Sequence, residues 1–365
     1  MVKKKINNTP HVAIWAHTPP PIGGMTLHVS RLLPKLEAAG ISYQMYGFEK
    51  DIAFVPEIFD VPNNRVKWLW RLFFGRVEDI HYVFTGRIWA VFLVTLIGKL
   101  RRKKIIWRIG GQNLYKGLYT SSRIERWLTA YCVRNVTAVV GVNKEICDLA
   151  VQWGVSKERV YHIPGFIPPN TNGKHIPKEV YDFFSGKSKK LITCGEVTQY
   201  GTYDTYGIWD LLDVFEKLQD VFPDTGLVIY AYEMDPRGPK AVEQFRSVIQ
   251  SKGLQDSVFI YESTVELWPA LSISDIYIRN STKDGDANSI REALSLGVPV
   301  VASDCAPRPE PTITYETGNT DALFEALYTC INNYDYYKRV TEDSGIEDNS
   351  KKIISLIENL IEHNE

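Results

Sequence analysis

Residues 278–304 read IRNSTKDGDANSIREALSLGVPVVASD, and this stretch decides the fold. An apolar strand ends near Arg279, a polar loop containing glycine follows, and a helix is expected to begin near Asn288 or Ser289. The apolar run Val298–Ala302 then predicts a second strand. A strand, a helix and a strand in this order form the repeating unit of a parallel α/β sheet.

The same alternation of strand-like and helix-like segments continues along the whole chain. Further strands are expected at His11–Ala16, Ile80–Phe84, Ile105–Ile109, Val136–Val142, Val160–Ile163, Leu191–Cys194, Leu227–Tyr230, Val258–Tyr261 and Ile276–Arg279. Helical patterns separate them at Arg87–Lys99, Ile124–Cys132, Lys144–Trp153, Trp209–Phe222 and Ala241–Lys252. Strands that are apolar almost throughout are typical of sheets covered on both faces.

A segment rich in Pro, Gly and Asn, Ile163–Gly173, predicts a linker between two domains. It separates residues 1–165 from residues 166–340, and each half has the pattern of a Rossmann-like domain. The last part, 341–365, contains a strongly amphipathic helix at Lys351–Glu362. We therefore expect an α/β fold of two Rossmann-like domains facing a cleft, with ligands at the carboxyl ends of the strands.

The composition is that of a globular protein, but the charge is unevenly distributed. The chain has 365 residues, 23% of them charged, and a net charge of −1. Residues 1–165 contain 24 Lys and Arg against 11 Asp and Glu, whereas the rest contains 18 against 32. A basic half suits nucleic acid, anionic lipid or phosphorylated substrates, and chance segregation of solvated charges is the alternative.

Neither a disulfide framework nor a metal site is indicated. The five cysteines include no C-x-x-C pair, and no HxH, HExxH or acidic cluster occurs. A reducing, cytoplasmic environment is therefore expected. The longest strongly apolar run, Ile88–Gly98, has 11 residues, which is shorter than the roughly 20 that a membrane-spanning helix needs.

Two acidic residues bracket the loop of the opening stretch. Asp284 lies in the loop and Glu292 lies in the first turns of the helix. Free N–H groups at the start of that helix can hold a phosphate, while the carboxylates can reach a sugar and a ribose. The alternative is a capped helix with two solvated carboxylates.

The spacing Asp284-x7-Glu292, followed by EALSLGVPVVAS at 292–303, resembles the signature of glycosyltransferase family four. These are retaining enzymes with the GT-B fold of two Rossmann-like domains. The form DGDANSIREAL is similar to a branch found among bacterial capsule and exopolysaccharide transferases. The resemblance implies that Glu292 binds the nucleotide ribose and that Asp284 contacts the donor sugar. It also implies that the distal phosphate is held around Gly285, Ala287, Asn288 and Ser289.

Other segments extend the resemblance over most of the chain. PIGGMTLHV at 21–29 is similar to the family's first glycine-rich loop, so Gly23 and Gly24 are expected near the donor phosphates. The final helix resembles the one that crosses back to the N-terminal domain in the family. The resemblance also implies a nucleotide diphosphate sugar as substrate, with no metal and no other cofactor.

The chain departs from the family where two cations usually neutralise the donor diphosphate. Gly195-Glu-Val stands where the family has Gly-Arg-Leu, and Tyr206-Gly stands where it has Lys-Gly. A diphosphate still needs positive charge. We expect Arg279 or Lys283 to supply it, with Arg308 as a third candidate and surface charge as the alternative. Arg291 is expected to pair with neighbouring acids.

The acceptor side is less well defined. The family often has His-Gly after the strand that corresponds to Ile105–Ile109, but GGQN follows here. Gly111 and Gln112 are therefore candidates for acceptor contacts. His81, on an adjacent strand, is a further candidate, and a hydrogen-bonded core histidine is its alternative.

The segment Arg65–Arg76, RVKWLWRLFFGR, predicts an interfacial helix. It carries apolar side chains on more than one face, with Arg and Lys beside them, as helices at membrane surfaces do. The basic cluster Lys99–Lys104 would add attraction to an anionic leaflet. A core helix with a solvated basic rim is the alternative. Nucleic acid is not expected as a partner, because no module that binds it occurs.

Together these features predict a retaining hexosyltransferase that uses a nucleotide diphosphate sugar. Its acceptor is expected to be lipid-linked or a polysaccharide, in cell-surface polysaccharide biosynthesis. It is expected to be cytoplasmic and peripheral at the inner face of the membrane. The alternatives are a GT-B nucleotide-sugar epimerase and a degenerate transferase that acts as the membrane-associated partner of an active one.

Overall fold

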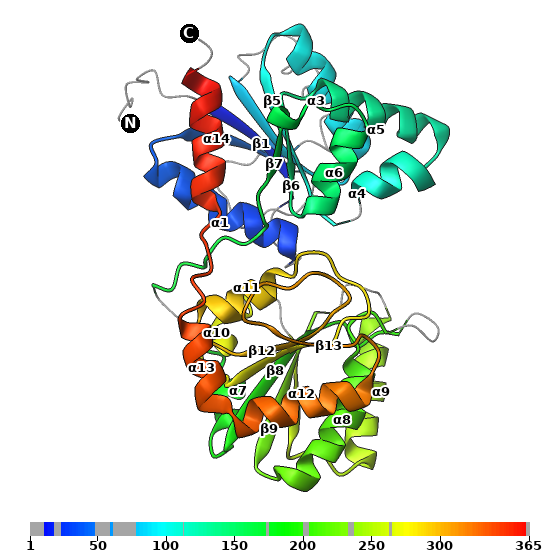
Figure 1. Cartoon of the computed structure of the whole chain (residues 1–365), viewed down its shortest axis with the longest axis vertical. Coiled ribbons are helices and arrows are strands. Elements are labelled where there is room, and N and C mark those ends of the chain that lie inside the picture. Colours follow the sequence, from blue (N-terminus) through cyan, green and yellow to red (C-terminus); the bar gives the residue numbers. More distant parts are fainter. Residues whose placement is uncertain are drawn as a thin grey trace. The chain divides into compact units, whose positions relative to one another are not determined.

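The computed structural model describes residues 11–17, 23–47, 59–60, 78–111, 113–172, 175–199, 204–232, 237–262 and 265–362. The chain forms two compact units. The first contains residues 1–167 and 348–365, and the second contains residues 168–347. Each unit is a parallel sheet flanked by helices (Figure 1).

Within the described residues, the first unit has seven parallel strands in the order β3-β2-β1-β4-β5-β6-β7. They are β1 His11–Ala16, β2 Ser42–Gly47, β3 Phe59–Asp60, β4 Ile80–Phe84, β5 Lys104–Ile109, β6 Ala138–Gly141 and β7 Val160–His162. The longer helices are α1 Gly24–Ala38, α3 Ile88–Leu100, α5 Arg123–Asn135, α6 Lys144–Gln152 and α14 Ser350–Glu362. Short helical turns occupy α4 Asn113–Tyr115, a π-helix at Lys116–Thr120 and a 3₁₀ turn at Lys157–Arg159.

Strand β1 shows why this sheet is covered on both faces. Ala13 and Trp15 belong to the core that α3, α5 and α6 cover. Val12 and Ile14 belong to the opposite core, which α1 and α14 cover. Alternate residues of a strand point to opposite faces, so an uninterrupted apolar run fills both cores.

The second unit has six parallel strands in its described part, in the order β10-β9-β8-β11-β12-β13. They are β8 Lys189–Gly195, β9 Thr225–Ala231, β10 Val258–Glu262, β11 Ile276–Arg279, β12 Val300–Ser303 and β13 Ile313–Tyr315. The helices are α7 Lys178–Phe184, α8 Ile208–Val221, α9 Gly238–Ser251, α10 Trp268–Leu271, α11 Asn288–Ser295, α12 Thr320–Asn332 and α13 Tyr334–Glu342. The strand order reverses between β8 and β11 here, and between β1 and β4 in the first unit.

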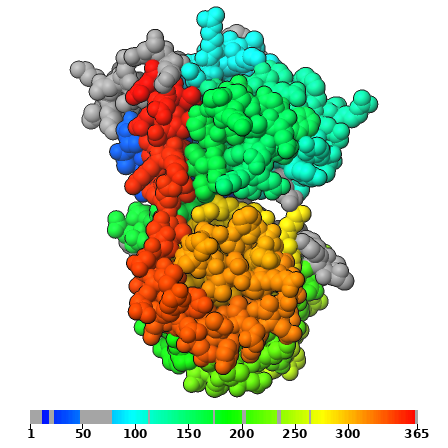
Figure 2. All heavy atoms as spheres, viewed as in Figure 1, coloured from blue at the N-terminus to red at the C-terminus, as the bar shows by residue number. Residues whose placement is uncertain are grey.

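The C-terminal helix belongs to the first unit, as the family resemblance implies. Ile353, Leu356 and Ile357 of α14 are buried in the same core as Val12 and Ile14. Figure 2 shows α14, in red, on the surface of the first unit. No helix in the described part of the chain is long and apolar enough to cross a bilayer.

The units divide after Ile167 and before Asp348, later than the predicted boundaries at 165 and 340. The reason for the first shift is a series of buried contacts to successive carbonyl groups of residues 163–167. Arg108 donates to the carbonyls of 163 and 164 (3.1 and 2.9 Å), and His28 Nδ1 to that of 165 (2.7 Å). Asn349 donates to 166 (3.1 Å) and Arg31 to 167 (3.0 Å). These five residues are therefore fixed to the first unit, although their composition predicts a linker.

Candidate functional site

The candidate donor site lies at the carboxyl ends of β8, β11 and β12. Cys194 and Gly195 end β8, Arg279 ends β11 and Ser303 ends β12. Because the strands are parallel, these ends lie at one edge of the sheet, beside the point where the strand order reverses. Ligands of open α/β sheets bind at such a point.

Two arginines converge on one carboxylate at this edge. Arg279 Nε lies 3.0 Å from Asp284 Oδ2, and Arg308 Nη1 lies 3.1 Å from the same oxygen. Arg308 also donates to the carbonyl of Ser303 (2.8 Å). All three charged side chains are largely buried. The cluster thus holds two cations and one anion, and it carries a net positive charge.

Electrostatics keeps the shared carboxyl group ionised. Burial by itself would raise the pKa of Asp284, but the nearby charge of Arg279 and then that of Arg308 outweigh burial and lower this pKa. The backbone N–H of Gly285 donates to the second oxygen of Asp284 (2.9 Å). Asp284 is therefore held in place as the counter-ion of both arginines.

Arg279 lies beside the two segments in which the sequence departs from the family pattern. Its guanidinium lies over the ring of Tyr206, 5.0 Å from the ring centroid, and its Nη1 donates to the carbonyl of Cys194 (3.3 Å). Gly195 allows this packing, because a Cβ there would lie 2.4 Å from the Tyr206 ring. Gly195 and Tyr206, the two departures from the family pattern, thus pack around the guanidinium of Arg279, which belongs to a different strand.

A second glycine fixes the loop under this site. Gly207 has a φ of 62°, in the left-handed region, and a Cβ there would lie 2.0 Å from the carbonyl oxygen of Asn280. Asn280 Nδ2 donates to the carbonyl of Gly207 (2.7 Å). Asp204 accepts from the backbone N–H groups of Tyr206, Gly207 and Trp209 at 2.9–3.1 Å. The start of α8 is therefore hydrogen-bonded to Asn280, the residue after Arg279.

Helix α11 begins next to this cluster, as the sequence predicts. Its N-cap residue, Ala287, has no side chain that could accept from the first-turn N–H groups. Ser289 accepts from the hydroxyl of Tyr277 (2.7 Å). Glu292 is buried one turn further along the helix. The start of a helix favours an anion, because its first N–H groups and its dipole carry partial positive charge.

The charged neighbours of α11 differ in their surroundings. Arg291 pairs with Asp286 (2.8 Å), which confirms the predicted pairing with a neighbouring acid. Lys283 is exposed. Of the three cations predicted to bind the diphosphate, the structure brings together Arg279 and Arg308. Arg308 was only the third candidate in the sequence analysis. The sequence Pro307-Arg-Pro did not indicate that Arg308 contacts Asp284. Arg308 lies in the loop after β12, whereas Asp284 lies in the loop after β11.

In the first unit, Gly23 and Gly24 lie at the start of α1. Gly23 is the N-cap residue, with an extended backbone, and its N–H donates to Thr26 Oγ1 (3.0 Å). Among the residues that the structure describes, none has an atom within 4 Å of where a Cβ of Gly23 would lie. A glycine at such a place lets the backbone approach a ligand.

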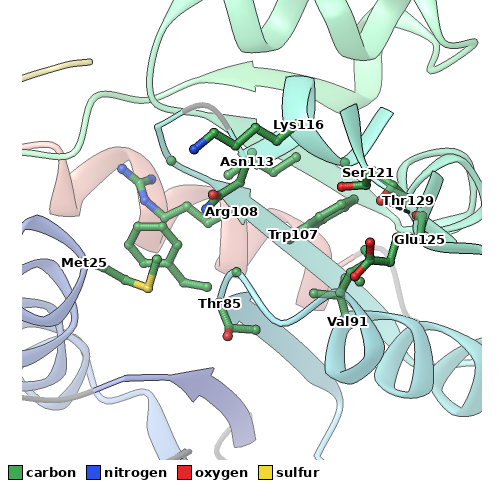
Figure 3. A pocket seen from close by; sticks show the side chains of 16 residues that line it. Met25, Thr85, Val91, Trp107, Arg108, Asn113, Lys116, Ser121, Glu125 and Thr129 are labelled. Carbon is green, nitrogen blue, oxygen red and sulfur yellow. Dashed lines mark hydrogen bonds between the residues drawn. The ribbon is translucent and has the colours of Figure 1, made fainter. Parts of the chain in front are cut away.

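A pocket of about 140 Å³ lies beyond the carboxyl ends of β4 and β5 (Figure 3). Arg108, Asn113 and Lys116 lie toward one end, and Ser121, Glu125 and Thr129 toward the other. Gly110 lines the pocket, whereas Gly111 is exposed beside it and Gln112 lies outside the described residues. Sequence reasoning missed Asn113 and Lys116, although their position just after β5 could have indicated them.

His81 lies in the core. It is buried on β4, and Trp15 Nε1 donates to its Nδ1 (3.0 Å). Burial, followed by the charges of Lys103 and Arg101, lowers the pKa of His81 to about 3. A buried neutral imidazole of this kind has no route to an acceptor, so its placement corrects the expectation of a site residue and supports the core alternative.

Two further expectations concern metals and the membrane. In the described ranges, no three His, Cys, Asp or Glu side chains gather as ligands of a metal ion would. The predicted interfacial helix Arg65–Arg76 lies outside the described residues. The basic cluster at Lys99–Lys104 spans the end of α3 and the start of β5.

Comparison with known proteins finds a family match in the second unit. Residues 185–344 match the family model for glycosyl transferases group 1. The chain is also similar to an uncharacterized glycosyltransferase of Haemophilus influenzae, with 23% identity over 288 residues that cover 77% of this chain and 74% of the relative.

Solved structures share the fold of the whole chain. Anabaena HepE in complex with UDP and glucose superposes with a TM-score of 0.72 at 14% identity, covering 97% of this chain and 100% of HepE. Sucrose-phosphate synthase from Thermosynechococcus elongatus gives a TM-score of 0.70 at 14% identity, covering 98% and 100%. The two Rossmann-like units therefore have the GT-B fold, as the sequence predicts.

Proposed function

We propose that the protein transfers a hexose from a nucleotide diphosphate sugar to an acceptor, with retention of configuration. The observation that carries this proposal is the cationic cluster of Arg279, Asp284 and Arg308 beside the start of α11, in a group 1 glycosyltransferase domain. HepE, of the same fold, binds UDP and glucose. The net positive charge and the adjacent N-terminus of α11 suit a diphosphate.

Each part of the site has a distinct role in this proposal. Arg279 and Arg308 neutralise the diphosphate, and the N–H groups around Ala287 and Ser289 bind its distal phosphate. Glu292 binds the ribose. Asp284 contacts the donor sugar and also holds both arginines in place, so part of its effect on the donor is indirect. No metal is needed, since the arginines and the helix dipole supply the positive charge.

The chemistry then consists mainly of orientation and charge stabilisation. The acceptor hydroxyl attacks the sugar from the face that the diphosphate leaves, and the departing phosphate takes the proton of that hydroxyl. Charge on the diphosphate grows as the glycosidic bond breaks, so the arginines bind the transition state more strongly than the ground state. Holding both reactants in place supplies the rest of the rate enhancement.

The acceptor is a lipid-linked sugar or a polysaccharide, and it binds to the first unit. The pocket beyond β4 and β5, with Arg108 and Lys116 at one end, supports this assignment. The excess of basic residues in 1–165 suits an anionic acceptor and an anionic membrane surface. We place the enzyme in the cytoplasm, peripheral to the inner face of the membrane, in cell-surface polysaccharide assembly.

The test uses purified protein, a panel of nucleotide sugars and a lipid-phosphate sugar acceptor. Transfer with release of nucleotide diphosphate is expected, and NMR of the product should show the anomeric configuration of the donor. An inverted product would refute retention. Conversion of a nucleotide sugar without any acceptor would instead favour an epimerase. Absence of a thermal shift with millimolar UDP, ADP or GDP would favour the degenerate partner.

A further inference from the structure

Helices α3 and α5 expose large apolar side chains where they begin. Trp89 of α3 is 55% exposed, and Ile124 and Trp127 of α5 are 62% and 60% exposed. Burying such side chains in the core is the usual outcome, so three at one place indicate a binding surface. Figure 1 shows α3 and α5 side by side in the first unit.

Ring contacts join α3 and α5 close to these side chains. Phe92, one turn after Trp89, has its ring centroid 5.8 Å from that of Trp127. Trp127 in turn stacks on Tyr131, with centroids 5.8 Å apart. Further along, Lys99 of α3 donates to Asn135 of α5, so the two helices run in the same direction. Their first turns, with Trp89, Ile124 and Trp127, therefore lie next to each other. We name these three residues the aromatic face.

Two exposed arginines flank the aromatic face. Arg123 and Arg126 are exposed on α5, directly beside Ile124 and Trp127. Between residues 86 and 135 the sequence contains eleven Lys and Arg but a single acid, Glu125. Glu125 caps its own helix, because it accepts from the backbone N–H of Ser122 (3.3 Å). The surface thus combines tryptophan with exposed arginine.

We propose that the aromatic face docks on an anionic lipid bilayer. Tryptophan prefers the boundary between head groups and acyl chains, and flanking arginines bind lipid phosphates. Helix α3 has 13 residues, too few to span a bilayer, and Val91, Val94 and Ile97 are buried in the core, so only its exposed face can meet lipid. The proposal rests on the proposed function, because it names the surface through which the acceptor unit meets its membrane.

The aromatic face lies next to the pocket proposed to bind the acceptor. Ile88 and Glu125 line the pocket of Figure 3, and each is the chain neighbour of a residue of the aromatic face. A sugar carried on a membrane lipid would therefore reach the pocket while its lipid stays in the bilayer. The face and the pocket lie on the same unit, so the placement does not depend on the second unit.

The test measures binding of the full chain to vesicles by co-sedimentation, with neither donor nor acceptor present. Vesicles of phosphatidylcholine alone are compared with vesicles that contain one third phosphatidylglycerol. Wild-type protein is expected to bind only the anionic vesicles, and binding should weaken as salt is raised. Trp89→Ala/Trp127→Ala should lower the partition coefficient at least tenfold, and Arg123→Gln/Arg126→Gln should lower it severalfold.

Matched variants separate the aromatic face from other surfaces. Tyr181→Ala/Tyr336→Ala removes aromatic side chains that are 58% and 56% exposed in the second unit, and it should leave binding unchanged. Trp68→Ala/Leu72→Ala tests the segment 65–76. If that variant alone abolished binding while Trp89→Ala/Trp127→Ala bound normally, the proposal would be wrong. Unchanged thermal unfolding and UDP affinity must accompany each variant, so that loss of binding is not loss of fold.

Three further outcomes distinguish membrane docking from dimerisation and from failure of the proposed function. If wild-type protein ignored anionic vesicles and its mass in solution were that of a dimer that Trp89→Ala/Trp127→Ala dissociates, the aromatic face would be an interface between copies. Transfer to a soluble acceptor by a protein that ignores vesicles would overturn the docking and leave the function standing. Vesicle binding without any transfer would support the docking and overturn only the function.

Discussion

Replacing Arg308 by methionine removes one of the two cations from the proposed donor site and keeps much of the side-chain volume. Arg308 is almost completely buried, and it donates to Asp284 and to the carbonyl of Ser303. A hydrogen bond to a charged group contributes about 1.5–3 kcal/mol, and an orphaned buried carbonyl costs about 1–3 kcal/mol. Asp284 keeps Arg279 and the N–H of Gly285, so the full cost of an unpaired buried charge does not apply.

We expect Arg308→Met to lower the free energy of unfolding by about 2–4 kcal/mol. If Arg308 also binds the diphosphate, its removal should raise the activation free energy of transfer by about 2–4 kcal/mol, in addition to its effect on the fold. That loss corresponds to a decrease of roughly 30- to 1,000-fold in kcat/KM. Urea unfolding followed by fluorescence measures the first quantity, and calorimetric titration with UDP and initial rates measure the second.

The matched control is Arg291→Met, which removes a cation of helix α11 that pairs with Asp286 at 2.8 Å. It should change kcat/KM by less than about fivefold, because one partly exposed ion pair contributes about 1 kcal/mol or less. The reasoning is refuted if Arg308→Met is destabilised as expected yet binds UDP as tightly as the wild type. Arg308 would then serve only as the counter-ion of Asp284.

The same variant has a pH signature. The arginines lower the pKa of Asp284 in the folded protein, so the carboxylate stabilises the fold above its ordinary pKa of about 3.9. That contribution disappears as the pH falls through the lowered pKa. The stability difference between wild type and Arg308→Met should therefore be largest near neutral pH and shrink below about pH 4.

Three further changes have defined outcomes. Glu292→Gln should weaken nucleotide binding and largely abolish transfer with the fold intact, and a kcat/KM near that of the wild type would contradict the donor site. Gly207→Ala should destabilise the protein by about 2–4 kcal/mol, through left-handed strain and the clash with Asn280, as urea unfolding can measure. His81 stays neutral in the fold with a pKa near 3, whereas the unfolded chain takes up its proton near pH 6.5. The wild type should therefore lose up to about 1.4 kcal/mol per pH unit below pH 6.5 relative to His81→Gln, and equal pH profiles of unfolding would disprove the buried neutral state.

The sequence predicted the parts of the fold that repeat a strong apolar period. The strands around β1, β4, β5 and β8 are apolar nearly throughout, and α14 has one apolar face, so their positions were found. Strand β2, SYQMYG, is half-covered and polar at its start, and β13 has three residues, so neither gave a run long enough to detect.

The site was predictable as far as it depends on local spacing. Asp284, the start of α11 and Glu292 follow one another in the chain, and a loop–helix pattern locates them. The partnership of Arg279 with Tyr206, and of Arg308 with Asp284, joins loops after three different strands. Such contacts depend on the strand order of the sheet, which no local pattern encodes. The burial of His81 has the same origin, because it depends on the strands on both sides of β4.

The contacts to the carbonyls of 163–167 have a consequence for the architecture of the gene product. Asn349 donates to the carbonyl of Phe166, so the points where the chain leaves and re-enters the first unit lie side by side. Lys35 holds Asp348 at the same place (3.2 Å). The second unit is thus an insertion into one surface position of an otherwise continuous domain. A few flexible residues that join Ile167 to Asp348 would close the first unit on itself, and residues 168–347 would form a separate module.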